Sequence, residues 1–150
     1  MANNKDKIKS GKDKGETKKI DESKKTKIHK TSQQPDNLLK FSFRHFSFSE
    51  KFFCPDTAQY LKIFLERLRE VSSWTIDDFR TKKTKSLRNH THDWENTTEP
   101  NGYTHLSQQL QECEPWQFCL TANAYGRVHG LLIDEVFYIV WLDVNHALYS

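Results

Sequence analysis

The chain has 150 residues, of which 35% are hydrophobic, and its formal net charge at pH 7 is +3. This length allows one domain with a modest hydrophobic core, and the absence of any run of 18 apolar residues argues against a membrane-spanning segment. The three cysteines, Cys54, Cys113 and Cys119, lack CxxC spacing, and the N-terminus lacks the apolar stretch of a secretory signal. We therefore expect a cytoplasmic protein with reduced thiols and no membrane contact.

The charge is divided between two parts of the chain. Residues 1–35 carry 11 lysines against 5 acidic residues, whereas residues 36–150 carry 12 Lys and Arg against 15 acidic residues. The first part has too few apolar residues to offset the entropy cost of ordering it. We predict a disordered Lys-rich tail over residues 1–35 and a single α+β domain over residues 36–150. The tail is either a solubilising segment or an arm attracted to nucleic acid.

The first half of the predicted domain contains a strand and two helices. Residues 41–48 alternate phenylalanine with polar residues, which predicts a strand. The first helix is predicted to begin with Asp56 as its N-cap, and the second with Thr75 as its N-cap and Phe79 facing inward. The first helix carries an apolar stripe of helical period: Leu61, Phe64, Leu65, Leu68 and Val71. Residues 80–112 are polar and predict only one helical turn near residues 106–111, so we treat them as an insertion.

The last third of the chain predicts a three-stranded antiparallel meander over residues 116–120, 127–133 and 136–142. Alternation places Arg127 and His129 on one face of the middle strand. Gly130 within that strand predicts a bulge or a close backbone approach. Residues 136–142 are apolar without alternation, which is typical of a strand buried on both faces. The predicted order is therefore a strand, a two-helix segment and a three-stranded meander, an α+β architecture.

This order resembles the RelE/ParE superfamily of bacterial toxins. The residues that carry the resemblance are 126–130, the strand at 136–142 and the ending at 145–149. The C-terminus is also similar to that of an uncharacterised group of bacterial proteins. The resemblance implies an endoribonuclease (an mRNA interferase) whose RNA 2′-hydroxyl attacks the adjacent phosphate. It also implies RNA or the ribosome and a cognate antitoxin protein as partners, with no cofactor and no metal.

The resemblance also assigns roles to side chains near the C-terminus. Arg127 matches a middle-strand arginine that would hold the phosphate with its planar guanidinium. His146 matches a C-terminal histidine that would act as general acid or base, and Tyr149 matches a terminal tyrosine that would orient or stack on the substrate. His129 shares the face of Arg127 and would be a second acid or base. Each of these residues also has an ordinary structural interpretation, as an exposed strand, sheet or turn residue.

The insertion supplies the remaining candidate contacts. The predicted substrate-binding residues are Lys82, Lys83, Lys85, Arg88 and His90. The spacing of His90 and His92, followed by His105 and Cys113, suggests zinc but fits no standard zinc finger, so we predict no metal site.

The net negative charge of residues 36–150 departs from the basic character that is usual for RelE-type nucleases. It favours an alternative, a non-catalytic ParE-like protein that acts by binding a protein target, as ParE toxins bind DNA gyrase. Another alternative is a nucleic-acid-associated accessory protein that works through its Lys-rich tail.

Overall fold

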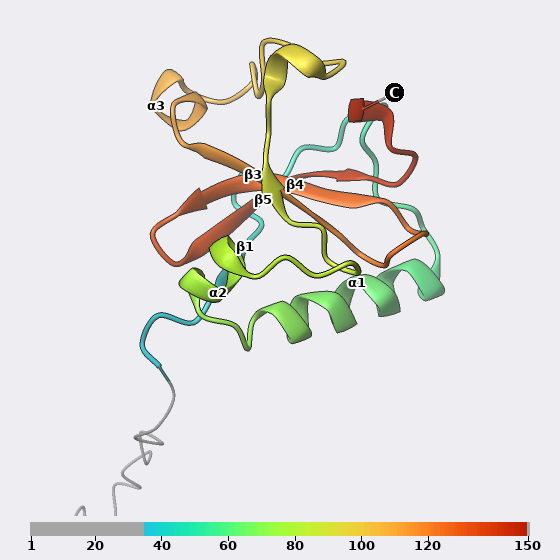
Figure 1. Ribbon diagram of the computed structural model, residues 1–150. Helices are drawn as coiled ribbons and strands as arrows, with labels where there is room; N and C mark the ends of the chain where they lie inside the picture. Colours follow the sequence, from blue (N-terminus) through green and yellow to red (C-terminus); the bar gives the residue numbers. More distant parts are fainter. Residues whose placement is uncertain (1–34, 150) are drawn as a thin grey trace, which may run out of the picture. The chain divides into compact units, whose positions relative to one another are not determined.

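The computed structural model describes residues 35–149, which form a mixed α+β domain (Figure 1). The strands are β1 (Lys40–Ser42), β2 (His90–Thr91), β3 (Glu114–Cys119), β4 (Arg127–Ile133) and β5 (Val136–Asp143). The helices are α1 (Ala58–Val71), α2 (Ile76–Thr81) and α3 (Gln108–Gln111), with 3₁₀ turns η2 (Trp94–Asn96) and η3 (Ala147–Tyr149). Among the described residues no helix is long and apolar enough to cross a membrane. The predicted tail lies, except for Pro35, outside the described residues.

The strands form one five-stranded sheet in the order β1-β5-β4-β3-β2. The predicted antiparallel meander is confirmed as β3, β4 and β5, and β1 pairs with β5 in parallel. The structure differs from the prediction in having a fifth strand, β2, which lies in the polar insertion and pairs with Trp116 and Gln117 of β3. A strand of two residues is too short to produce a readable period in the sequence.

The start of α1 also differs from the prediction. Its N-cap is Thr57 rather than Asp56, and the Thr57 side chain accepts a hydrogen bond from the backbone N–H of Tyr60. The N-cap of α2 is Thr75, as predicted, and Asp78 completes a capping box with it. The buried face of α1 is rotated relative to the predicted stripe, because Tyr60 is buried and Leu61 and Leu65 are exposed.

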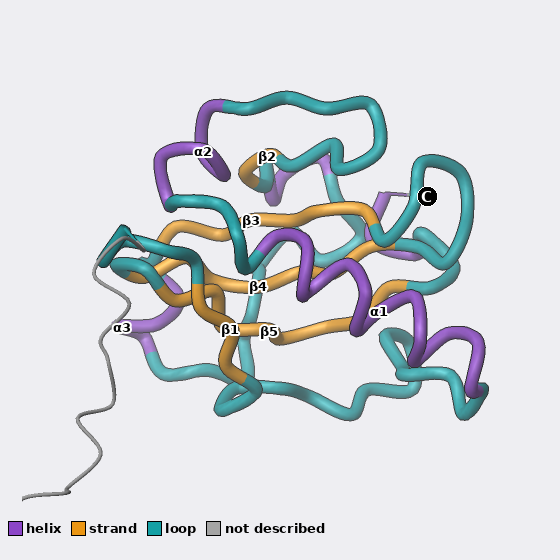
Figure 2. The backbone as a smooth tube through the Cα atoms, turned by 90° about the horizontal axis from the view of Figure 1, so that it is seen from below, coloured by secondary structure: helices purple, strands orange, loops and turns teal. Residues whose placement is uncertain are grey.

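The sheet is covered on both faces. Figure 1 shows α1 and α2 below the sheet, with α3 and the C-terminus above it, and Figure 2 views the sheet from the side of α1. The core on the helix side includes Phe64, Phe79, Trp116, Phe118, Val128, Phe137 and Ile139. A second core on the opposite face includes Phe52, Tyr103, Leu131, Val140, Trp141 and Leu148. The strand β5 contributes to both cores, as its unbroken apolar sequence predicted.

A β-bulge between β4 and β5 changes which face the end of β5 presents. His129 pairs with Trp141, but the next residue, Gly130, pairs with Ile139, so Val140 is the extra residue. A Cβ atom on Gly130 would lie 2.1 Å from the backbone oxygen of Tyr138. The predicted bulge and close backbone approach at Gly130 are therefore confirmed. The bulge places Trp141 on the same face as Val140, and the candidate site depends on this change of phase.

Candidate functional site

The cross-strand register gathers polar side chains on the sheet face opposite α1 and α2. One row crosses four strands and consists of His90, Gln117, His129 and Trp141. The adjacent row consists of Cys119, Arg127 and Asp143. Because residues of one row lie on one side of the sheet, five titratable side chains from separate parts of the chain become neighbours.

A continuous chain of hydrogen bonds runs through this face. Oδ2 of Asp143 lies 3.3 Å from Nε2 of His129, and Nδ1 of His129 lies 3.2 Å from Nε2 of His92. The chain ends where Nδ1 of His92 lies 2.8 Å from the hydroxyl of Tyr149. We call this set of four side chains, Asp143, His129, His92 and Tyr149, the relay.

The contacts of Asp143, at the buried end of the relay, determine which groups of the relay donate and which accept. Both carboxylate oxygens of Asp143 accept backbone N–H groups, Oδ1 from Ala147 at 2.7 Å and Oδ2 from Leu148 at 2.9 Å. His129 must therefore donate its Nε2–H to Asp143 and accept at Nδ1. In turn His92 donates Nε2–H to His129 and accepts the hydroxyl proton of Tyr149 at Nδ1. Every group in the relay then has one consistent role.

Burial sets the charge states that this arrangement requires. Burial lowers the pKa of His129, against the opposing effect of Asp143. Burial, with the nearby charges of His129 and His90, lowers the pKa of His92 to about 2. Burial works to raise the pKa of Asp143, but hydrogen bonds from His129 and two backbone N–H groups hold that pKa below its usual range. At neutral pH the relay therefore contains one carboxylate and two neutral imidazoles.

Aromatic rings enclose the inner part of the relay. Phe52 stacks on Trp141 with ring centroids 4.3 Å apart and lies edge-on to His129. The ring of Trp94 lies 4.7 Å from that of His92. His129 and Asp143 are at most 1% exposed, whereas Tyr149 is 37% exposed. The relay is therefore most exposed to solvent and ligands at Tyr149, where burial and the charge of Asp93 raise the phenol pKa above its usual value despite the opposing effect of Arg127.

One arginine, Arg127, acts electrostatically on this exposed end of the relay. Nη1 of Arg127 lies 2.7 Å from the sulfur of Cys119 and donates a hydrogen bond to it. Arg127 and Arg88 both act electrostatically on Cys119, although burial still raises the pKa of that thiol. Arg127 also acts on Tyr149. A guanidinium group near an exposed phenol is a suitable place for a phosphate.

The structure brings together most of the C-terminal residues that the sequence singled out. Arg127, His129 and Tyr149 meet at the relay, and the His90 ring lies 6.2 Å from the Tyr149 ring. His146 does not join them. It is exposed in the turn after β5 with a φ of 57°, and it takes no part in the hydrogen bonds of the relay.

The basic residues of the insertion have separate environments. Lys82 pairs with Asp78 of α2 and lies over the ring of Trp74. Lys83 donates to the backbone oxygen of Asn89 at 2.8 Å. Lys85 is exposed, and its backbone oxygen accepts Nε of Arg88. Of these basic residues, Arg88 is the one with an electrostatic link to the site, through Cys119.

Sequence reasoning missed two relay members as acid–base residues. From the sequence, His92 is a candidate only for zinc binding. The described residues contain no group of three or more side chains placed to hold a metal ion. Asp143 follows an apolar strand and precedes the C-terminal turn. The signal that identifies Asp143 is a carboxylate at the end of a strand, just before a turn. This carboxylate accepts the backbone N–H groups that lie four and five residues later in the chain.

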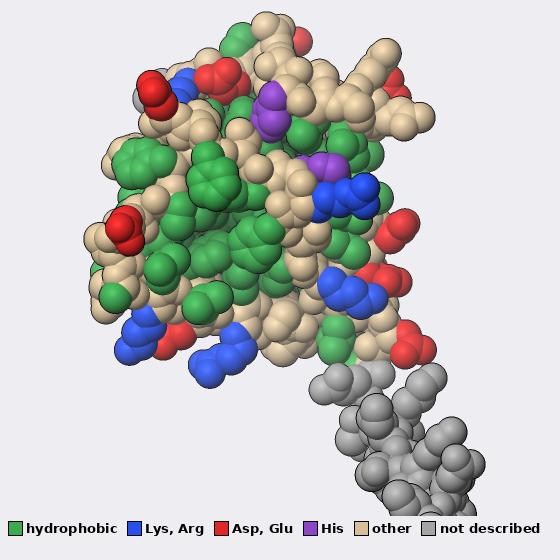
Figure 3. Space-filling view, turned by 180° about the vertical axis from the view of Figure 1, so that it is seen from behind, with side chains coloured by type: hydrophobic (Ala, Val, Ile, Leu, Met, Phe, Trp, Pro, Cys, Tyr) green, Lys and Arg blue, Asp and Glu red, His purple; other side chains and the backbone are tan. Residues whose placement is uncertain are grey.

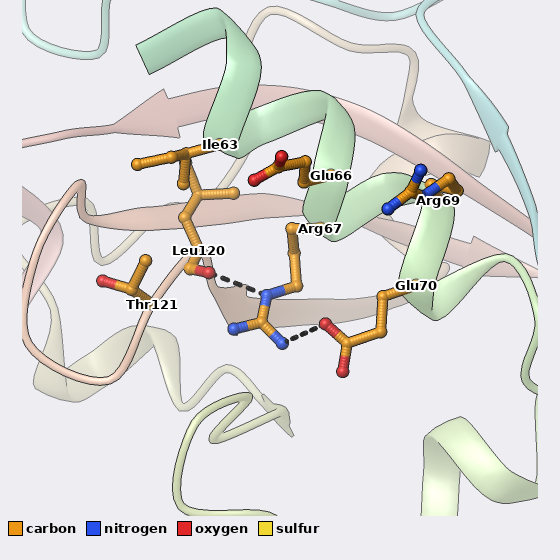
Figure 4. Close-up of a pocket in the computed structure, with 7 residues that line it drawn as sticks. All are labelled: Ile63, Glu66, Arg67, Arg69, Glu70, Leu120 and Thr121. Atoms are coloured by element: carbon orange, nitrogen blue, oxygen red, sulfur yellow. Dashed lines mark hydrogen bonds and ion pairs between the residues drawn. The ribbon is translucent and has the colours of Figure 1, made fainter. Parts of the chain in front are cut away.

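A pocket lies elsewhere, beside α1 (Figure 4). Its volume is about 540 Å³, and Arg67 in its wall donates to the backbone oxygen of Leu120 and to Glu70. Two arginines and two glutamates line it, so its charges cancel. Its residues contain no member of the relay.

Comparison of the chain with protein-family models, with curated proteins and with solved structures finds no match.

Proposed function

We propose that this protein is a RelE-like endoribonuclease that cleaves mRNA by attack of a 2′-hydroxyl on the adjacent phosphate. The observation that carries the proposal is the relay, which runs from a buried carboxylate to an exposed phenol beside Arg127. RNA, either free or on the ribosome, is the substrate in this proposal, and a cognate antitoxin is the expected protein partner. The order of β1, α1, α2 and the β3–β5 meander supports the underlying resemblance.

The relay suits the removal of a proton from an RNA hydroxyl. In the proposed step the 2′-oxygen bonds to phosphorus as its proton passes to the oxygen of Tyr149. The phenol proton moves to Nδ1 of His92 only as the bond to phosphorus forms, and Asp143, acting through His129, offsets part of the burial that lowers the pKa of this imidazole. The bond from phosphorus to the 5′-oxygen breaks, and that oxygen takes a proton from water at the exposed edge. The products are a 2′,3′-cyclic phosphate and a 5′-hydroxyl.

The arginines supply the electrostatic part of the step. Arg127, and Arg88 near it, would bind the phosphate and stabilise the negative charge of the phosphorane. The acid–base role that the resemblance gives to His146 passes in this proposal to Tyr149 and His92, because His146 lies outside the relay.

Tyr149→Phe tests the proposal directly. The full chain is incubated with a labelled single-stranded RNA and, separately, with mRNA on translating ribosomes, and the products are analysed for 2′,3′-cyclic phosphate ends. We expect Tyr149→Phe to lower the cleavage rate by about 10²- to 10⁴-fold, the usual contribution of a general acid or base. Tyr138→Phe is the matched control, because the Tyr138 ring packs on His45 and its hydroxyl takes no part in the hydrogen bonds of the relay.

The same assay contains the outcomes that reject the proposal. An RNA with 2′-deoxy substitution at the cleaved position must resist cleavage, because it lacks the nucleophile. Absence of cleavage in both free RNA and translated mRNA would overturn the endoribonuclease function. Equal rates for Tyr149→Phe and Tyr138→Phe would remove the relay from the chemistry.

A ParE-like binding function is the second candidate, and a surface observation favours it. Figure 3 shows hydrophobic side chains gathered on one face of the domain. The large exposed hydrophobic residues include Phe43, Phe48, Phe53, Leu61 and Leu65. Exposed apolar area of this kind is typical of protein-binding surfaces. Growth arrest on induction that survives Tyr149→Phe but is lost on Phe48→Asp would favour this second function.

A further inference from the structure

We infer that Asp143 is a positioning residue that sets the direction of every hydrogen bond in the relay and so makes Tyr149 the proton donor to His92. The inference rests on the proposed function only for its effect on RNA cleavage. The direction of the hydrogen bonds is a property of the folded chain without any substrate.

The argument begins with the partners of the Asp143 carboxylate. Two backbone N–H groups, those of Ala147 and Leu148, donate to its two oxygens, and a backbone N–H has no alternative role. The carboxylate therefore presents only acceptors to His129. No other hydrogen-bond acceptor within the described residues contacts Nε2 of His129, whose side chain is fully buried.

The tautomer of His129 determines the tautomer of His92 and the direction of the Tyr149 hydrogen bond, because each imidazole is neutral. A neutral imidazole has one donor and one acceptor nitrogen. With Nε2–H on His129, His92 must also carry Nε2–H, and Tyr149 must donate. If His129 carried its proton on Nδ1 instead, His92 would donate to Tyr149, and the phenol could no longer pass its proton inward.

Asp143 also holds the turn that carries Tyr149. The backbone N–H groups that it accepts belong to the first two residues of η3, and Tyr149 is the third. A second residue, Thr98, holds the same turn without touching the relay: its hydroxyl donates to the backbone oxygen of Ala147 at 2.7 Å. Thr98→Val therefore loosens the turn and leaves the donors and acceptors of the relay intact, which makes it the matched control for Asp143.

The test is ¹⁵N NMR of the full chain labelled at histidine, without RNA, because the two tautomers of imidazole have different nitrogen shifts. We expect His92 and His129 both to carry their proton on Nε2 in the wild type. Asp143→Asn replaces one acceptor by an N–H donor, so this single tautomer should be lost at both histidines, whereas Thr98→Val should keep it. In RNA cleavage Asp143→Asn should lower the rate at least 10²-fold, more than Thr98→Val does.

His129→Gln gives a second measurement, that of the His92 tautomer, which does not depend on how well Asp143→Asn folds. The glutamine amide has an NH₂ group that can donate to Asp143 and a carbonyl oxygen that can accept from His92, so His92 should keep its Nε2–H tautomer. Protons on Nδ1 in the wild type, or a wild-type tautomer pattern in folded Asp143→Asn, would overturn the inference. Lack of RNA cleavage with the expected tautomers would reject the proposed function alone.

Discussion

Both faces of the sheet contain buried side chains, but these are apolar on one face and partly polar on the other. The core against α1 and α2 is a cluster of apolar side chains, with Phe79 in ring contact with Trp116, Phe118 and Phe137. The opposite face buries His129, Asp143 and Gln117 beside its aromatic residues. Burial of apolar area supplies stability on the first face. On the second face His129 and Asp143 are held by hydrogen bonds, which fix geometry at a cost in stability, whereas Oε1 of Gln117 has no partner among the described residues.

The largest expected effect belongs to the apolar face. Phe79→Ala should lower the free energy of unfolding by about 3–5 kcal/mol, because it removes a fully buried ring and leaves a cavity. Urea denaturation measures the loss. The tautomers of His92 and His129 should stay unchanged in the folded variant, since Phe79 lies on the other side of the sheet. Phe48→Ala is the control, because that ring is 87% exposed and its loss should cost less than about 0.5 kcal/mol.

Gly130→Ala should affect both faces at once. The added Cβ would meet the Tyr138 backbone oxygen and the Phe137 ring, so strands β4 and β5 must separate at the bulge. We expect a loss of about 3 kcal/mol in urea denaturation, the upper part of the usual cost of overpacking. Because the bulge aligns Asp143 with His129, the NMR signature of the relay should change as well. Unchanged stability and unchanged histidine shifts would show that the two strands do not approach so closely at this point.

The polar face should make stability depend on pH. In the unfolded chain a histidine takes up a proton below about pH 6.5, whereas the pKa values of His92 and His129 are lowered in the folded protein, that of His92 to about 2. The unfolded state therefore binds more protons as the pH falls below about 6.5, and each histidine should cost about 1 kcal/mol of stability per pH unit.

Urea denaturation between pH 7.5 and 4.5 measures this slope, and His92→Gln should reduce it by about 1 kcal/mol per pH unit, with His129 and His105, whose pKa burial also lowers, contributing to the remainder. The pKa of Asp143 is also lowered by folding, so its contribution is present above about pH 4 and is lost as the pH falls further. A free energy of unfolding that is flat from pH 7 to pH 5 would contradict the neutral, buried histidines of the relay.

The apolar face was largely predictable from the sequence, and the polar face only in part. The meander, the Thr75 cap, the inward Phe79 and the irregularity at Gly130 follow from patterns a few residues long. The cap of α1 was misplaced by one residue, because Asp56 and Thr57 are both good N-caps. Phe64, Leu68 and Val71 of the predicted stripe are buried, whereas Leu61 and Leu65 are exposed and Tyr60 is buried in their place. His92 was missed because its partners lie 37 and 57 residues away in the chain.

By itself the sequence determined the α+β class, the three long strands and the shared face of Arg127 and His129, since each depends on the alternation of side chains within one strand. The tertiary structure alone decided that His92 and Asp143, rather than His146, complete the site. Two things that alternation cannot reveal made that choice: the pairing of the short strand β2 with β3, and the extra residue that turns Asp143 toward His129. Both are contacts between distant segments, and their free energy comes from packing and hydrogen bonds that exist only in the folded chain.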